Sequence, residues 1–108
     1  MKARRITIPA AALLMVSAEP ALASEALARI NGCFQCHSTE RGVSGPTFEQ
    51  IAARHKGDAG ARRALMETVK KGGKGQWTAV TRGIPMPPYS PRLSDADIQR
   101  LVDWVLSL

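Results

Sequence analysis

Five consecutive residues restrict the folds open to this chain more than any other segment: Cys33-Phe34-Gln35-Cys36-His37. The spacing Cys-x-x-Cys-His is the attachment sequence for c-type haem. Its two thiols are placed to reach the two vinyl groups of one porphyrin, and the histidine supplies an imidazole nitrogen to the iron. We therefore expect one covalently bound haem c per chain, with Cys33 and Cys36 as the thioether residues and His37 as the proximal iron ligand.

Three other uses of two nearby cysteines fit the sequence less well. A redox-active dithiol usually accompanies a βαβ pattern, and no such pattern is visible. A zinc site needs further ligands, but the chain has no second cysteine pair and only one other histidine, His55. A disulfide between Cys33 and Cys36 would close a loop too small to constrain much of the chain.

The N-terminus has the three parts of an export signal. Residues 1–5 are basic, Ile6–Ala18 is largely apolar, and Ala21-Leu22-Ala23 is a small-x-small cleavage sequence. We expect residues 1–23 to be a cleavable signal and residues 24–108 to be one mature domain in the periplasm, without a membrane span. An uncleaved anchor is the alternative, but the apolar run is too short to cross a bilayer comfortably.

The mature segment has little apolar mass for a core of its own. It contains only two Trp, two Phe and one Tyr, and a domain of this size buries a small core, so a haem acting as part of the core fits. Its 12 basic and 8 acidic residues give a net charge of +4, which suits docking to acidic protein surfaces. The basic residues are scattered, with no arginine-rich run, so we expect no nucleic-acid binding.

Apolar spacing predicts an all-α fold of three to four short helices. The expected helices cover residues 25–36, 47–54, 61–71 and 94–106. Thr47 and Gln50 match a capping box at the start of the second helix, and Ser94 opens the last one in the same way. Residues 72–92 are rich in Gly and Pro and are expected to form one long loop.

A six-coordinate haem needs a second axial ligand, and methionine raises the reduction potential. Met66 and Met86 are the two methionines that remain once the signal is removed. Met66 lies in an expected helix, where packing is its ordinary role, whereas Met86 stands between prolines that stiffen its loop. We expect Met86 to bind the iron, ahead of Met66 and of His55, which lies in a basic surface stretch.

With these motifs in this order, the chain resembles the small bacterial class I c-type cytochromes, which are soluble one-electron carriers of the periplasm. The resemblance covers nearly all of residues 25–108. It is carried by five segments: Cys33–His37, Gly45-Pro46, 72–77 (Gly-Gly-Lys-Gly-Gln-Trp), 84–88 (Ile-Pro-Met-Pro-Pro) and 101–106. It implies the cytochrome c fold, with short helices wrapped around one covalent haem and a long loop that carries the methionine ligand.

The resemblance also implies roles for individual residues. The carbonyl of Pro46 would accept a hydrogen bond from His37 and fix its ring. The indole N–H of Trp77 would bind a haem propionate. The last helix would cross the first near Gly32, where a missing side chain permits close approach.

Two departures from the family concern the long loop. The segment Thr78–Gly83 is longer than the corresponding gap in the closest family members, so we expect it to bulge at one edge of the haem pocket. Tyr89 stands where several relatives have an asparagine that bonds the ligand sulfur, which alters the tuning of the iron.

The expected function is one-electron transfer without enzymatic activity, because His37 and Met86 would both stay on the iron. The chain would act as a monomer that meets redox proteins with acidic docking surfaces, at a haem edge near Phe34 and Gln35. One alternative is a permanent haem subunit of a periplasmic dehydrogenase or reductase. Another is a haem sensor or enzyme in which Met86 is displaced.

Overall fold

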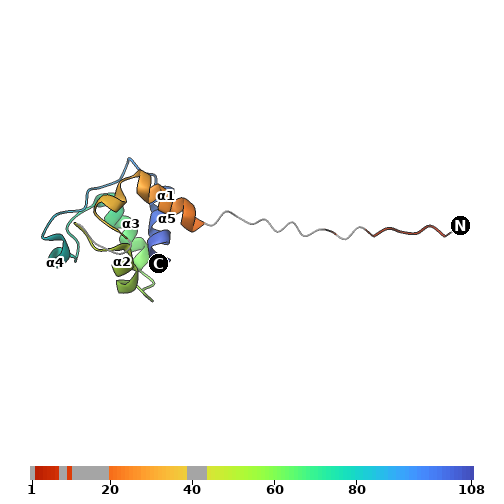
Figure 1. The fold of residues 1–108 in the computed structure, drawn as a ribbon, viewed down its shortest axis with the longest axis horizontal. Helices are drawn as coiled ribbons and strands as arrows, with labels where there is room; N and C mark the ends of the chain where they lie inside the picture. The colour runs from red at the N-terminus through yellow and green to blue at the C-terminus, as the bar shows by residue number, and fades with distance from the viewer. Residues whose placement is uncertain (1, 8–9, 11–19, 39–43) are drawn as a thin grey trace.

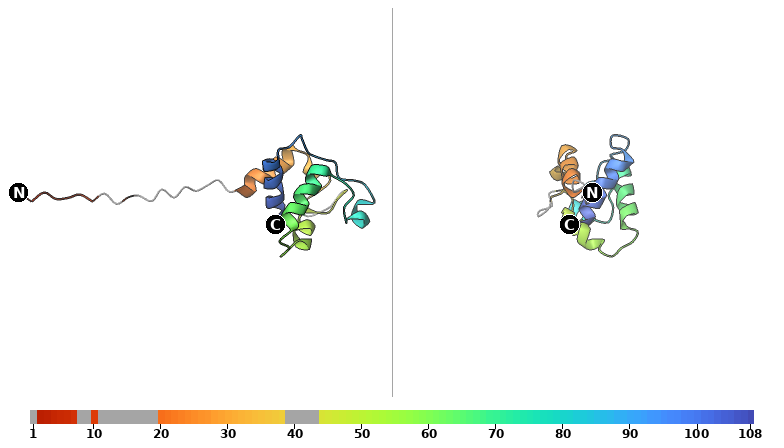
Figure 2. Two further views of the ribbon diagram at one scale, coloured as in Figure 1. Left: turned by 180° about the vertical axis from the view of Figure 1, so that it is seen from behind. Right: turned by 90° about the vertical axis from the view of Figure 1, so that its right-hand side faces the viewer.

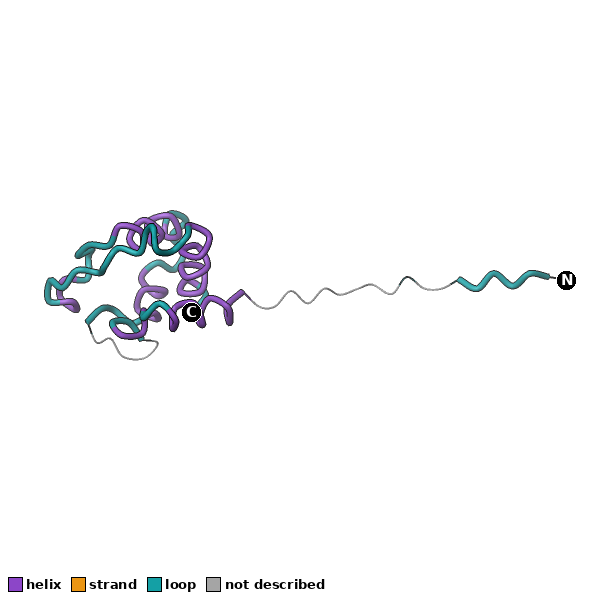
Figure 3. Tube along the Cα trace, turned by 90° about the horizontal axis from the view of Figure 1, so that it is seen from above, coloured by secondary structure: helices purple, strands orange, loops and turns teal. Residues whose placement is uncertain are grey.

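The computed structural model describes residues 2–7, 10, 20–38 and 44–108. These residues form an all-α fold, as the sequence predicts, and Figure 3 shows helices and loops only. Its elements are α1 (Pro20–Ile30), the 3-10 helix η1 (Cys33–Gln35), α2 (Phe48–Arg54), α3 (Ala61–Lys71), α4 (Thr78–Thr81) and α5 (Asp95–Leu106). Within the described ranges, the nearest approach to a sheet is an isolated antiparallel bridge between Gly73 and Met86.

The first helix ends earlier than expected. Instead of one helix over residues 25–36, α1 stops at Ile30 and the cysteine motif starts a separate 3-10 helix. Gly32 has a φ of +74°, the left-handed conformation that commonly ends a helix. The atoms nearest to a side chain built at Gly32 belong to Gln35, at 3.6 Å. Gly32 therefore serves this turn, and the packing of α1 against α5 is compatible with the crossing near Gly32 that the resemblance implies.

The second and third helices follow their local signals closely. The Thr47 side chain accepts from the Gln50 N–H at 3.0 Å, and the Gln50 side chain accepts from the Thr47 N–H at 2.9 Å. This capping box satisfies two N–H groups that the helix itself leaves unpaired. α3 ends where Gly72 adopts a φ of +68°.

Helix α5 is the centre of the fold. It packs against α1, α2 and α3, and the views in Figures 1 and 2 show it between α1 and α3. Its buried side chains are Ile98, Leu101, Val102 and Trp104. The Trp104 ring lies 4.9 Å from the Phe48 ring in an edge-to-face arrangement, which favours aromatic contacts. The small core therefore concentrates its aromatic side chains where α2 meets α5.

The long loop contains one element that the sequence pattern does not show. Thr78–Thr81 form the single-turn helix α4 inside the segment expected to bulge. Figure 1 places α4 at the far end of the loop, apart from the other helices. The expected bulge is therefore a compact turn that ends at Arg82 with a φ of +55°.

The expected export signal falls largely outside the described residues. Most of its apolar segment lies in the ranges 8–9 and 11–19, while residues 2–7 and 10 are exposed and form no regular element. The expected cleavage point, between Ala23 and Ser24, lies within α1. In the part of the chain that is described, no helix has the length and apolar character needed to cross a bilayer.

Candidate functional site

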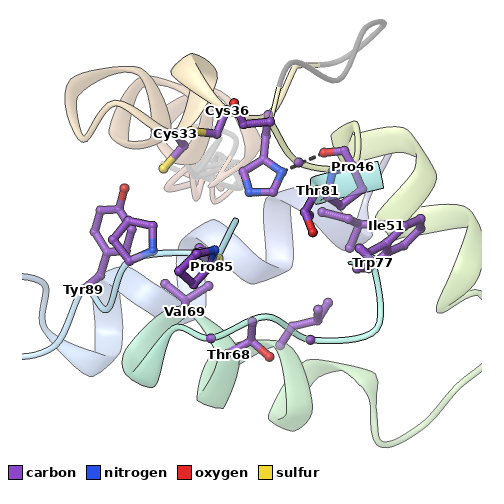
Figure 4. A pocket seen from close by; sticks show the side chains of 18 of the residues that line it. Cys33, Cys36, Pro46, Ile51, Thr68, Val69, Trp77, Thr81, Pro85 and Tyr89 are labelled. Carbon is purple, nitrogen blue, oxygen red and sulfur yellow. Dashed lines mark hydrogen bonds between the residues drawn. The ribbon is translucent and has the colours of Figure 1, made fainter. Parts of the chain in front are cut away.

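An open cavity of about 240 Å³ lies between the helices and the loop that follows α3. Its wall is mostly apolar and includes side chains from α2, α3 and α5 (Figure 4). All six residues that the sequence nominates for the cofactor line it: Cys33, Cys36, His37, Pro46, Trp77 and Met86. The fold thus brings residues more than fifty positions apart in the sequence to one site.

The turn that follows η1 holds the two cysteines and the histidine together. The carbonyl of Cys33 accepts from the His37 N–H at 2.9 Å and from the Cys36 N–H at 3.3 Å. Figure 4 shows Cys33 and Cys36 on the same wall of the cavity, and their thiols are not joined in a disulfide. Burial raises the pKa of the Cys33 thiol above its ordinary value, so this group is neutral at neutral pH.

The carbonyl of Pro46 fixes the His37 ring. Nδ1 of His37 lies 2.7 Å from the Pro46 oxygen, the contact that the resemblance implies (dashed in Figure 4). Because a carbonyl oxygen only accepts, Nδ1 carries the ring proton and Nε2 keeps a free lone pair. Burial lowers the pKa of His37, although the bond to Pro46 opposes this shift. The ring is therefore held in the neutral form that binds metal ions.

Gly45 leaves the space that the His37 ring occupies. A Cβ built at Gly45 would lie 2.9 Å from Cε1 and 3.1 Å from Nδ1 of His37. Both distances are shorter than ordinary van der Waals contact, so any larger residue must push the ring or the loop aside. Pro46 follows directly, so the glycine and the hydrogen-bond acceptor act on the same ring.

We expect Gly45→Ala to weaken the bond between His37 and Pro46 and to destabilise the haem protein by about 1–3 kcal/mol, as overpacking does. A weaker bond makes the imidazole a poorer donor to ferric iron, so the reduction potential should rise. Denaturant unfolding and potentiometric titration measure the two effects. Gly60→Ala is the control, because a Cβ there meets only Asp58 Oδ1 at an ordinary 3.5 Å. Unchanged values in Gly45→Ala would contradict this account of the ring.

Backbone hydrogen bonds hold the segment that carries Met86 against the end of α3. Gly73 and Met86 donate to and accept from each other, both at 2.9 Å. Two further N–H groups donate to carbonyls in the last turn of α3: Tyr89 to Val69 at 3.0 Å and Ser90 to Lys70 at 3.2 Å. These four bonds, here called the α3 clamp, fix the backbone on both sides of the Met86 side chain.

The two competitors for the sixth ligand position lie elsewhere. Met66 is half-buried and packs against the hydrophobic core. His55 follows α2, with its Nδ1 3.7 Å from Asp58 Oδ2. Neither side chain is among the described residues that line the cavity.

Trp77 lies at the cavity wall and is tied to α2. The guanidinium of Arg54 lies 4.9 Å from the centre of the Trp77 ring, and its Nη2 donates to Gln76 Oε1 at 2.6 Å. Thr81 of α4 also lines the cavity and is buried. Sequence reasoning missed Thr81, because no periodic signal marks a single-turn helix.

Tyr89 closes another part of the wall. Its side chain is buried, and the Arg92 guanidinium lies 4.7 Å from the ring centre. Burial raises the pKa of the Tyr89 hydroxyl, so the phenol remains protonated. An aromatic ring therefore fills the position where an asparagine was expected from the family pattern.

The Phe34 side chain packs against the aromatic core. Its ring lies 5.2 Å from that of Phe48 and 5.9 Å from that of Trp104. The Arg29 guanidinium covers it at 4.2 Å. Next to it, Gln35 is exposed, and a docking edge near these two residues stays a prediction.

The residues on the cavity wall fit a covalently bound haem. A large apolar ring system matches the mostly apolar wall, two thiols stand on one side, and a neutral imidazole with a free Nε2 lies beside them. Met86, which carries a thioether, also lines this cavity. Zinc fits less well, because no three His, Cys, Asp or Glu side chains in the described ranges are grouped to hold a metal ion.

Comparison with known proteins agrees with this chemistry. Residues 20–105 match the family described as cytochrome c oxidase, cbb3-type, subunit III. The chain is 43% identical over 94 residues to cytochrome c-551 of Allochromatium vinosum, an alignment that covers 87% of this chain and 95% of the relative.

Two solved structures share the fold. The crystal structure of Nitrosomonas europaea cytochrome c552 matches with a TM-score of 0.68 at 39% identity, over 78% of this chain and 98% of that one. A class 1 cytochrome from Sideroxydans lithotrophicus matches with a TM-score of 0.65 at 30% identity, over 79% of this chain and 91% of that one. Both alignments span nearly the whole of the solved chains.

Proposed function

This chain belongs to the small monohaem c-type cytochromes, electron-transfer proteins that bind haem c covalently and are not enzymes, and we propose that it is a periplasmic one-electron carrier with His37 and Met86 on the iron. The observation that carries the proposal is that His37 and Met86 line the same cavity, with His37 Nδ1 engaged by Pro46 and the Met86 backbone held by the α3 clamp. Export would remove residues 1–23 and leave residues 24–108 as the working domain.

Each site residue has a defined task in this proposal. Cys33 and Cys36 would hold the porphyrin through thioether bonds, and Trp77 would bind a propionate. Pro46 keeps the His37 ring in one tautomer, so Nε2 is always the nitrogen available to iron. When bound, the haem supplies an iron that alternates between ferric and ferrous states. Because backbone contacts hold His37 and Met86 in place, both residues would keep their positions in the two states, which favours rapid electron transfer.

Carbon monoxide binding tests whether the sixth position is closed. We expect the reduced haem protein to bind carbon monoxide slowly or not at all at neutral pH, because the Met86 thioether occupies the position that the gas needs. The measurement is the optical spectrum of the reduced protein before and after addition of the gas. Rapid and complete binding would contradict the carrier proposal and favour a sensor or an enzyme with an open site.

One observation favours a second function, a permanent haem subunit of a larger redox complex. The matched family is described as a subunit of an oxidase. The proposal of a free carrier predicts that the exported protein elutes at the mass of one chain in gel filtration of an unfractionated periplasmic extract. Elution with a larger protein, retained at high salt, would favour the subunit.

A further inference from the structure

Helix α4 stands apart from the other helices and borders the cavity. Among the described elements, α4 packs against no other helix. Its Thr81 faces the cavity, and Ile84, just beyond the helix, also lines it. Figures 1 and 3 both place α4 at one end of the molecule, away from α1 and α5. This turn is therefore an outer edge of the cofactor site.

The outer side of this edge is apolar. Val80, which does not line the cavity, is 41% exposed, and Ile84, which lines the cavity, keeps part of its surface at the cavity mouth. Single exposed apolar residues are common on protein surfaces, so these two offer a partner a small apolar contact whose weight depends on the charges around it. The paired backbones of Gly73 and Met86 also bring the next residue, Lys74, to the same strip of chain.

The charge around this apolar pair has one sign. Between Glu67 and Asp95 the sequence has no acidic residue, but it has five basic ones: Lys70, Lys71, Lys74, Arg82 and Arg92. Lys70 pairs with Asp95, and Lys71 pairs with Glu67. Lys74 and Arg82 are exposed and have no ion pair with any described residue. Their positive charges are therefore available to a partner.

The backbone at Arg82 gives independent support. Arg82 closes α4 in the left-handed conformation, with a φ of +55°, and its N–H donates to the Thr78 carbonyl at 2.9 Å. This conformation costs a residue with a side chain about 1 kcal/mol relative to glycine. Arginine is thus not the residue that best forms this turn, which points to a role for its charged side chain.

We propose that Lys74, Val80, Arg82 and Ile84, here called the α4 surface, form the docking site for an acidic redox protein that presents carboxylates around an apolar centre. This inference rests on the proposed carrier function and names a contact surface separate from the expected haem edge near Phe34 and Gln35. The two cations steer and orient the partner, and the two apolar side chains meet its centre. Electrons then enter or leave at the edge of the cofactor site that α4 covers.

The test measures the rate at which an acidic carrier protein, reduced flavodoxin, reduces the exported haem protein. At low ionic strength we expect Arg82→Glu to slow this reaction roughly three- to tenfold, and Arg82→Lys to retain the wild-type rate. High salt should remove most of the difference, because it screens exposed charges. Val80→Ser should slow the reaction at high salt as well, because it removes apolar contact and not charge.

The matched control is Arg63→Glu, which makes the same change in charge on the face of α3 opposite to Leu65, Thr68 and Val69, the α3 residues that line the cavity. Its rate with flavodoxin should stay close to wild type. Neutral hydroquinone, a small reductant that needs no docking surface, should reduce every variant at the wild-type rate. Equal slowing by Arg82→Glu and Arg63→Glu would overturn the α4 surface, because net charge alone would then explain the effect.

Two further outcomes separate this inference from others. A wild-type protein that neither flavodoxin nor hydroquinone reduces would overturn the carrier function itself. Sedimentation of the protein with vesicles of anionic phosphatidylglycerol, abolished by Arg82→Glu but not by Arg63→Glu, would show that the α4 surface binds a membrane and would overturn the protein partner.

Discussion

Met86→Ala is expected to abolish the weak far-red absorption band of ferric iron bound to methionine and to lower the reduction potential by roughly 0.1–0.3 V, a part of the ~0.8 V that axial ligands span. The physical reason is that a thioether stabilises ferrous iron, and water or a nitrogen ligand in its place does so less well. The sixth position then opens, so the reduced variant should bind carbon monoxide rapidly. Optical spectra and potentiometric titration measure these changes.

Met66→Ala is the matched control for this prediction. Met66 packs against the core and does not line the cavity. Its truncation should destabilise the fold by about 2 kcal/mol, the lower end of the range for core methionines, because the side chain is only half-buried. The far-red band and the potential should stay as in the wild type. A band that survives in Met86→Ala but disappears in Met66→Ala would refute the ligand assignment.

Gly72→Ala is expected to displace the loop that carries Met86 while leaving the Met86 side chain unchanged. A Cβ at Gly72 would point into the backbone of that loop, 2.8 Å from Pro88 N and 2.9 Å from Pro87 C, and closer still to the Met86 carbonyl. These atoms belong to a proline-rich backbone that cannot rotate away. The φ of +68° adds about 1–2 kcal/mol of strain for any residue with a side chain.

We expect Gly72→Ala to lower the free energy of unfolding by about 3 kcal/mol or more, combining backbone strain with overpacking, and to weaken the far-red band. Gly75→Ala separates the two causes, because Gly75 has a φ of +58° but nothing within 4 Å of a Cβ. That control should lose only the strain energy and keep the band. Equal losses in the two variants would mean that conformation alone matters at Gly72 and that the steric account is wrong.

The sequence predicts helices well where short-range signals define them. Thr47 and Gln50 form the expected capping box, and Ser94 accepts from the Asp97 N–H at 3.1 Å at the start of α5. These contacts join residues three positions apart, so the local sequence contains all the information. Gly32 is different, because glycine is compatible both with a weak helix interior and with a left-handed end. The choice between them depends on the surrounding fold, so the local sequence predicts a helix that continues past Ile30, where α1 ends.

The same distinction holds for the candidate site. Cys33, Cys36 and His37 are adjacent in a motif, and the flanking prolines single out Met86, so the sequence could nominate them. The α3 clamp could not be predicted, because its bonds use backbone groups that have no residue signature. The packing of Phe34 between Phe48 and Trp104 also depends on distant elements. Local patterns therefore predict which side chains form the site, while contacts between distant segments determine how those side chains are positioned.

The α3 clamp has a consequence for the length of the loop. Gly73 and Met86 are paired, so the twelve residues between them begin and end at fixed points. Lengthening a surface loop whose ends are already fixed costs little, because closure entropy grows only slowly with the number of residues. Insertions between positions 74 and 85, such as the turn of α4, can therefore accumulate without moving the methionine sulfur. The contact surface of this small protein is free to diverge while the coordination chemistry beside it stays constant.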